Sequence, residues 1–250
     1  MCCRVDEVIS ITYKKRLERT VAIMADVYKF KVKLRELPKI MWRDIEISST
    51  ATLSELAYAV LVAFEATASH LFNIRFKGVC YDISFKDEET ERVLNEQCKN
   101  LFQEILEGIG VKLPEEINDI YMEPTMNPTK IKLSELKLVR GNVLNMEYDF
   151  GAEWLFSIKL THITEMKKDT ETHYPYVIDG QGKGIIEDIC PFELAEIIRE
   201  ANETGNLPKI YDAFSDEEEG VEWDYNDFDL EHCNRFLKDK IHEMQSLYEE

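Results

Sequence analysis

The sequence lacks the short motifs that mark several well-known active sites. It contains no Cys-x-x-Cys pair, no His-x-His or His-Glu-x-x-His pair and no Gly-x-Ser-x-Gly stretch. The glycine-rich stretch DGQGKG at 179–184 has neither Ser nor Thr after its lysine, so it fails the phosphate-loop pattern. Zinc sites, nucleophilic serine elbows and phosphate loops usually show such spacings. We therefore expect neither a cofactor nor a metal site.

Basic residues are also scarce, because 30 Lys and Arg stand against 49 Asp and Glu, which gives a net charge of −19. Binding to nucleic acid or to anionic membranes depends on cationic side chains that neutralise phosphate, so this charge disfavours both. The imbalance is uneven: residues 1–50 carry 11 basic and 7 acidic residues, whereas 201–250 carry 4 and 15. A protein is the partner that this pattern favours.

Long hydrophobic runs and paired cysteines are missing as well. The longest apolar run, LAYAVLVAF at 56–64, is too short to cross a bilayer, and the first ten residues lack the basic-then-apolar pattern of a secretory signal. The six cysteines are scattered along the chain, which is typical of reduced thiols in a cytosolic protein. The sequence therefore predicts a cytoplasmic protein without a membrane partner.

Alternating apolar and polar residues predict strands that are joined in hairpins. Lys77-Gly78 suits a tight hairpin turn, and Gly151-Ala152 forms the corner of another pair. The predicted pairs are 28–37 with 40–48, 70–76 with 79–85, and 143–150 with 153–163. Consecutive hairpins of this kind favour a mainly antiparallel sheet.

Apolar residues spaced three to four apart predict helices elsewhere. The clearest is 52–64, where Thr52 and Glu55 have the spacing of a capping box and Leu53 opens the apolar face. The other predicted helices are 88–108, 191–203 and 229–249. The expected fold class is α+β, with a mainly antiparallel sheet layered with about four helices.

The same patterns predict the domain organisation. Residues 28–250 are expected to form one α+β domain, and 1–27 form an N-terminal leader whose structure the pattern leaves open. Three prolines mark 111–129 as a loop, and the run of acidic residues marks 215–228 as a solvated acidic loop.

The stretch YDFGAEWLF at 148–156 raises the question of an active site, because it places two carboxylates beside one glycine. We interpret it as a strand-turn-strand corner, whose aromatic residues pack the sheet while Asp149 and Glu153 face water or bond turn amides. Paired carboxylates can also perform acid–base chemistry when they are buried or close together. His70, Asp149 and Glu153 therefore remain weak catalytic candidates.

Several segments, taken together, resemble the plasmid Ri open-reading-frame-three-like family. They are PKIMWRDI at 38–45, TLSEL at 52–56, SHL at 69–71, the corner YDFGAEW at 148–154 and FDL at 228–230. The residues that carry the resemblance are Trp42, Arg43, Thr52, Leu53, His70, Tyr148, Asp149, Phe150, Gly151 and Trp154. The resemblance implies an α+β fold.

The sequence also departs from the family pattern. Phe72 stands where the family has a second histidine, Ala152 stands where it has a second aspartate, and its later acidic stretch is reduced to Glu187-Asp188. If the family's polar residues form a site, this chain has lost most of it.

We therefore expect a non-enzymatic protein-interaction or accessory factor linked to mobile elements. One alternative is a degenerate or unrecognised hydrolase with its site near His70 and Asp149. Another is the resolvase-like, nucleic-acid-associated role with which family members are often labelled. The acidic charge disfavours that role, and no arginine cluster or helical DNA-binding module is visible in the sequence.

Overall fold

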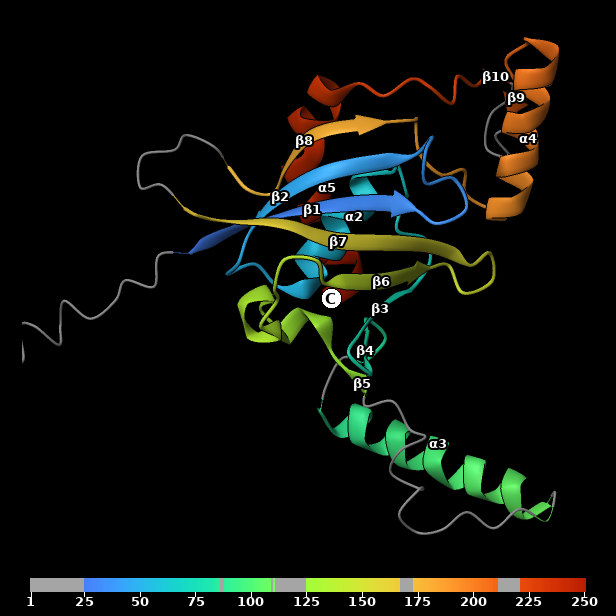
Figure 1. Cartoon of the computed structure of the whole chain (residues 1–250). Coiled ribbons are helices and arrows are strands. Elements are labelled where there is room, and N and C mark those ends of the chain that lie inside the picture. The colour runs from blue at the N-terminus through green and yellow to red at the C-terminus, as the bar shows by residue number, and fades with distance from the viewer. Residues whose placement is uncertain (1–24, 86–87, 109, 111–124, 167–172, 211–220) are drawn as a thin grey trace, which may run out of the picture.

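The computed structural model describes residues 25–85, 88–108, 110, 125–166, 173–210 and 221–250. Its centre is an eight-stranded sheet in which neighbouring strands run antiparallel, except for the parallel pair β4–β5 at one edge (Figure 1). In spatial order the strands are β5 (Thr125–Met126), β4 (Val79–Asp82), β3 (Phe72–Phe76), β6 (Val143–Tyr148), β7 (Trp154–Glu165), β1 (Asp26–Leu34), β2 (Trp42–Ser48) and β8 (Tyr176–Gln181). The α+β fold class is confirmed.

The three predicted hairpins form, and alternation sets which face of each strand is buried. In β1, Phe30, Val32 and Leu34 are fully buried, whereas the lysines between them point to the other face. Lys77 and Gly78 both have positive φ, as a type I′ turn requires.

Helix α2 (Leu53–Ala63) lies at the centre of the buried layer behind the sheet (Figure 1). The predicted capping box is confirmed: the Glu55 amide donates to Thr52 Oγ1 over 3.1 Å, and the Thr52 amide donates to Glu55 Oε2 over 2.6 Å. Helix α5 (Leu230–Glu249) packs on the same side and buries Leu237 and Ile241.

The prediction of about four layered helices is one too many. Within the described residues, α2, α5 and α4 (Pro191–Thr204) contribute buried side chains to the core. Helix α3 (Glu88–Gly108) instead extends away from the sheet (Figure 1). Its apolar residues Leu101 and Ile105 are exposed. A local apolar period therefore predicted the helix but not where it lies.

Two segments that the sequence predicts as a connector or a loop contain short strands. The connector at 174–189 contains the edge strand β8, whose alternation is obscured by its glycine. The predicted acidic loop contains β10 (Val221–Glu222), which pairs with β9 (Lys209–Ile210). Short 3-10 turns occur at Pro128–Lys130 and Leu133–Leu136.

The predicted leader and proline-containing loop lie largely outside the described residues. Residues 1–24 and 111–124 are not described, although β1 already begins at Asp26. In the described part of the chain, none of the helices combines the length and apolarity that a membrane crossing needs.

Candidate functional site

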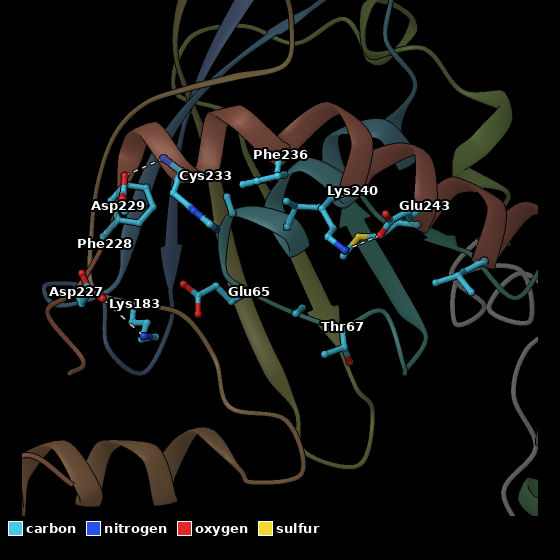
Figure 2. A pocket seen from close by; sticks show the side chains of 16 residues that line it. Glu65, Thr67, Lys183, Asp227, Phe228, Asp229, Cys233, Phe236, Lys240 and Glu243 are labelled. Atoms are coloured by element: carbon cyan, nitrogen blue, oxygen red, sulfur yellow. Dashed lines mark hydrogen bonds and ion pairs between the residues drawn. The ribbon is translucent and has the colours of Figure 1, made fainter. Parts of the chain in front are cut away.

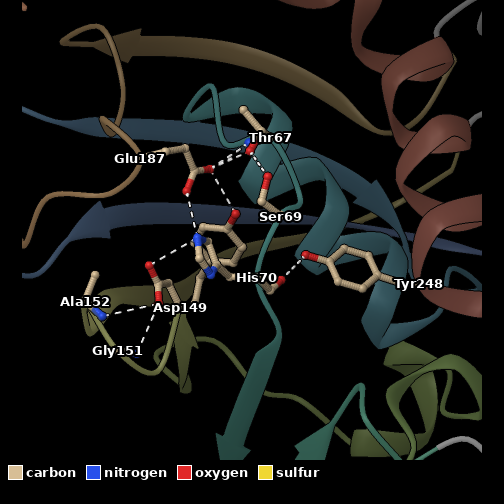
Figure 3. Close-up of polar contacts among 9 residues, drawn as sticks. Thr67, Ser69, His70, Asp149, Gly151, Ala152, Glu187 and Tyr248 are labelled. Carbon is tan, nitrogen blue, oxygen red and sulfur yellow. Dashed lines mark hydrogen bonds and ion pairs between the residues drawn. The ribbon is translucent and has the colours of Figure 1, made fainter. Parts of the chain in front are cut away.

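Three loops that are distant in the sequence bring His70, Asp149 and Glu187 together (Figure 3). His70 lies between α2 and β3, Asp149 opens the turn between β6 and β7, and Glu187 lies between β8 and α4. One ligating atom from each side chain lies within 4.8 Å of the others. We call these three residues the polar cluster.

The β6–β7 turn fixes the direction of the Asp149 carboxylate. Asp149 has a φ of 55°, in the left-handed region that non-glycine residues seldom occupy. Its Oδ1 accepts hydrogen bonds from the amides of Gly151 (3.0 Å) and Ala152 (3.3 Å). Its Oδ2 is thereby turned toward His70 and lies 3.5 Å from Nε2.

Glu187 is held in a similar way, through only one of its two oxygens. Oε1 accepts hydrogen bonds from the Tyr148 hydroxyl (2.9 Å) and from the amide (2.8 Å) and hydroxyl (3.1 Å) of Thr67. Oε2 is buried, has no hydrogen-bond partner and lies 3.8 Å from His70 Nε2. A buried carboxylate oxygen without a donor is costly, so this atom is poised to bind a cation.

Two tyrosines hold His70, the third residue of the polar cluster, in place. The Tyr248 hydroxyl of α5 donates to the main-chain oxygen of His70, and the Tyr148 ring makes an edge contact with the His70 ring at 5.9 Å. Burial, and then the negative charge of Glu187, raise the pKa of Tyr148, so its hydroxyl remains a donor to Glu187. The His70 side chain is 34% exposed, which leaves one side of the cluster open to solvent.

The non-glycine residues with positive φ are concentrated around this cluster. Ala68 lies two residues before His70, Asp149 belongs to the cluster, and Asp188 follows Glu187. Each such conformation costs about 1–3 kcal/mol and persists only where the surrounding structure imposes it, often at functional sites. All three loops of the cluster therefore carry this strain.

The structure separates the residues of the sequence-predicted corner. It brings Asp149 close to His70 but leaves Glu153 exposed on the far side of the turn. Trp154 and Tyr148 pack fully into the core, as interpreted, whereas Phe150 is 43% exposed and does not pack the sheet. Of the two roles expected for Asp149, facing water or bonding turn amides, the structure shows the second, and it also buries the carboxylate beside His70.

Glu187 is the residue that sequence reasoning missed as a member of the site. The only signal was its place in the one acidic pair that this chain retains from the later stretch of the resembled pattern. No local spacing links it to His70, because the contact depends on the path of the whole connector after β8.

The spacing of the polar cluster suits a small divalent ion. Nitrogen and oxygen ligands about 2.0–2.1 Å from a tetrahedral ion lie about 3.3 Å from one another. The separations of 3.5 and 3.8 Å from His70 Nε2 are close to that value, and the two carboxylate oxygens lie within 4.8 Å of each other. One imidazole and two carboxylates form a donor set used for zinc and neighbouring transition metals.

A groove of about 750 Å³ lies beside α5 (Figure 2). It runs from the end of α2 along α5 and is lined in part by Phe236, Lys240 and Leu247. The side chains of the polar cluster do not line it, so it meets the cluster only through Thr67, which also donates to Glu187.

Arg43, another residue of the resemblance, has a different role. It is fully buried, and all five of its N–H groups donate to main-chain oxygens, those of Trp42, Ala63, Gln181, Gly182 and Lys183. Burial lowers the pKa of Arg43 to about 10, which leaves the guanidinium charged at neutral pH. Arg43 therefore ties the connector to the sheet and has no donor left for a ligand.

Comparison with known families explains why these motifs occur together. The model of the family described as plasmid pRiA4b ORF-3-like protein matches residues 26–236. The chain belongs to this family. The match confirms the resemblance inferred from the sequence, and it covers each segment that contributes to the polar cluster. Among curated proteins, none matches the chain.

A solved structure supports the fold of this family member. It is a protein of unknown function, MM3350 from Methanosarcina mazei Go1, which is 17% identical in sequence. The alignment covers 84% of this chain and 98% of that chain, with a TM-score of 0.55. At this identity the likeness extends to the fold alone.

Proposed function

We propose that this family member binds a divalent transition-metal ion at His70, Asp149 and Glu187. The observation that carries the proposal is the arrangement of the two carboxylates. In each, one oxygen is already held by protein donors while the other faces His70 Nε2. Outer hydrogen bonds that orient ligands in this way are typical of metal sites.

Zn²⁺ is the ion to test first. A neutral imidazole is a good ligand for zinc and a poor one for Mg²⁺ and Ca²⁺, which prefer oxygen ligands. We therefore expect Zn²⁺ to bind, and Mg²⁺ and Ca²⁺ to compete weakly.

The test is a zinc titration of the purified, metal-free full chain against a chromophoric chelator. Asp149→Asn keeps the acceptor for the turn amides and suits a positive φ, and Glu187→Gln keeps the acceptor for Tyr148. We expect each substitution to weaken zinc binding at least tenfold without unfolding the chain. The matched control is Glu153→Gln, in the same turn but outside the cluster, which should leave the affinity unchanged.

The six cysteines of the chain require a second readout. Co²⁺ bound by thiolates gives intense charge-transfer absorption, which a site of one histidine and two carboxylates lacks. Equal zinc affinity in the parent chain, Asp149→Asn and Glu187→Gln, or thiolate absorption with Co²⁺, would refute the proposed site.

Hydrolysis is a second candidate function, supported by the number of ligands. Catalytic zinc sites commonly have three protein ligands and leave a position for water, whereas structural sites have four. The cluster supplies three ligands and His70 is partly exposed, so a bound ion would retain an open position. Such an ion lowers the pKa of its water and makes it a nucleophile. Zinc-dependent turnover of generic ester and phosphoester substrates, lost in Glu187→Gln, would support this activity.

The accessory role expected from the sequence, binding another protein, also remains a proposal. It is supported by a face of the sheet that no described helix covers and on which Lys33 and Lys159 are exposed, although the net charge of the chain is negative. Recovery of the chain without any bound protein under near-physiological salt would count against this role.

A further inference from the structure

Among the described residues, the helices that pack on the sheet cover only one of its faces. Helices α2 and α5 lie behind the sheet in Figure 1, and strands β1, β2 and β7 face the viewer in front of them. Pairing register identifies the side chains on this front face: Lys31 is opposite Asp44 on β2 and opposite Lys159 on β7, and Lys33 is opposite Ser157. Their sequence neighbours, such as Val32 and Ile158, fill the core on the other face.

Cationic side chains gather on this open face although the chain is acidic as a whole. We call the following residues the basic patch: Lys31, Lys33, Arg35, Arg75 and Lys159. Asp44 forms an ion pair with Lys31 at 3.2 Å, and Glu147 forms one with Arg75 at 3.1 Å. The remaining three, Lys33, Arg35 and Lys159, make no ion pair with the described part of the chain.

The lysines of the patch lie close together on the sheet. Lys31 and Lys159 are direct partners across the β1–β7 ladder, and Lys33 is the next residue along that face. Like charges directly opposite each other in a sheet are destabilising, so the isolated chain gains nothing from this arrangement. An anionic partner would relieve the repulsion.

The patch also surrounds a hollow of about 560 Å³. Lys33, Arg35 and Arg75 line its sides, together with the polar side chains of Asn145 and Ser157. Glu147 also lines the hollow and is ion-paired with Arg75, so Lys33 and Arg35 are the lining cations that make no ion pair with the described part of the chain. Such cations can bind carboxylates through charge-assisted hydrogen bonds.

We propose that the basic patch binds an acidic segment of a partner protein in an extended conformation. Successive outward side chains of β1 stand about 6.6–7 Å apart, which is also the spacing of alternate side chains in an extended peptide. An alternating acidic peptide can therefore place its carboxylates against Lys31, Lys33 and Arg35 in turn. Nucleic acid fits less well, because Asp44 and Glu147 lie within the same face and the chain's charge of −19 repels a dense line of phosphates.

The test uses a fluorescent peptide of alternating Glu and Ser residues and measures its anisotropy with the full-length chain. We expect binding at low salt that weakens as salt rises, and a loss of at least tenfold in Lys33→Gln/Lys159→Gln. The matched control is Lys238→Gln, an exposed lysine of α5, which should change the affinity less than twofold.

Two further measurements keep the outcome decisive. Lys33 and Lys159 are exposed, so the double variant should fold, and it should melt at or slightly above the parent temperature because repulsion is removed.

A single-stranded oligonucleotide of equal charge serves as the competing ligand. If it binds more tightly than the peptide and depends on the same lysines, or if the double variant binds the peptide as the parent does, the proposal is overturned. Glu187→Gln should leave peptide binding intact, which separates this inference from the metal site.

Discussion

The connector after β8 contacts two polar centres, the Arg43 guanidinium and the polar cluster. They differ in how completely their hydrogen bonds are satisfied. At Gln181–Lys183 the connector surrounds the Arg43 guanidinium, whose five N–H groups all have main-chain acceptors. Phe64 and Phe228 cover the guanidinium at 4.7 and 3.7 Å. A few residues later, Glu187 enters the polar cluster with Oε1 hydrogen-bonded and with Oε2 accepting no hydrogen bond from the described part of the chain.

The contrast separates a structural centre from a candidate binding centre. A buried charge with every hydrogen bond made stabilises one arrangement of the chain and has nothing left to offer a ligand. The polar cluster is partly exposed, and one of its buried oxygens accepts no hydrogen bond, so it retains an atom that a ligand can bind. The same connector is anchored to Arg43 at one end and presents Glu187 to the polar cluster at the other.

The largest effect on stability should come from removing the hydrogen-bonded guanidinium of Arg43. Arg43→Met leaves the five main-chain oxygens without their donor, and we expect a loss of about 3–5 kcal/mol in the free energy of unfolding. Urea denaturation measures it. Arg235→Met, which removes only an exposed ion pair of α5, should cost less than about 1 kcal/mol. Similar losses in the two variants would remove the distinction between the centres.

The second-largest effect on stability should come from zinc binding at the polar cluster. Free Zn²⁺ at a hundred times its dissociation constant should stabilise the parent chain by about 2.7 kcal/mol, because only the folded state assembles the three ligands. Thermal melting with and without zinc measures the shift. At the same zinc concentration an at least tenfold weaker site in Asp149→Asn should stabilise the chain by no more than about 1.4 kcal/mol, and a full zinc shift in that variant would contradict the assignment.

A third test concerns the close packing that anchors the connector. A Cβ at Gly182 would lie 2.5 Å from the Ile40 main-chain oxygen, whereas one at Gly205 would meet nothing within 4 Å. Both glycines have similar positive φ, 77° and 72°, so backbone strain is nearly matched. Gly182→Ala should therefore cost about 2 kcal/mol more than Gly205→Ala in urea denaturation. Equal costs would show that the connector can move away from Ile40.

The smallest effect should come from the outer hydrogen bond of the polar cluster. Tyr148→Phe leaves Glu187 with Thr67 as its remaining donor, and we expect zinc affinity to fall about tenfold, or about 1.4 kcal/mol. Tyr58→Phe is the control, because the Tyr58 hydroxyl donates to Glu249 outside the cluster. Equal zinc affinity in the two variants would mean that Tyr148 does not orient Glu187.

Much of the fold could be predicted because its signals are local. Alternation predicted the β1–β2, β3–β4 and β6–β7 hairpins, and the Thr52–Glu55 spacing predicted the start of α2. Strand β8 was missed, because Gly180 interrupts the alternation and an edge strand needs only one partner. The position of α3 was missed because an apolar period does not say whether the rest of the chain offers a surface.

By itself the sequence determined the secondary-structure periods, the antiparallel hairpins and the family, since each depends on residues that are neighbours along the chain or occur in a fixed order. Only the tertiary structure decided that Glu187 joins His70 and Asp149, that Glu153 does not, and that the lysines of β1 share a face with Lys159. The physical reason is that these arrangements depend on how strands pair and where loops turn. A shift of one residue in a strand's register would carry its side chains to the other face of the sheet.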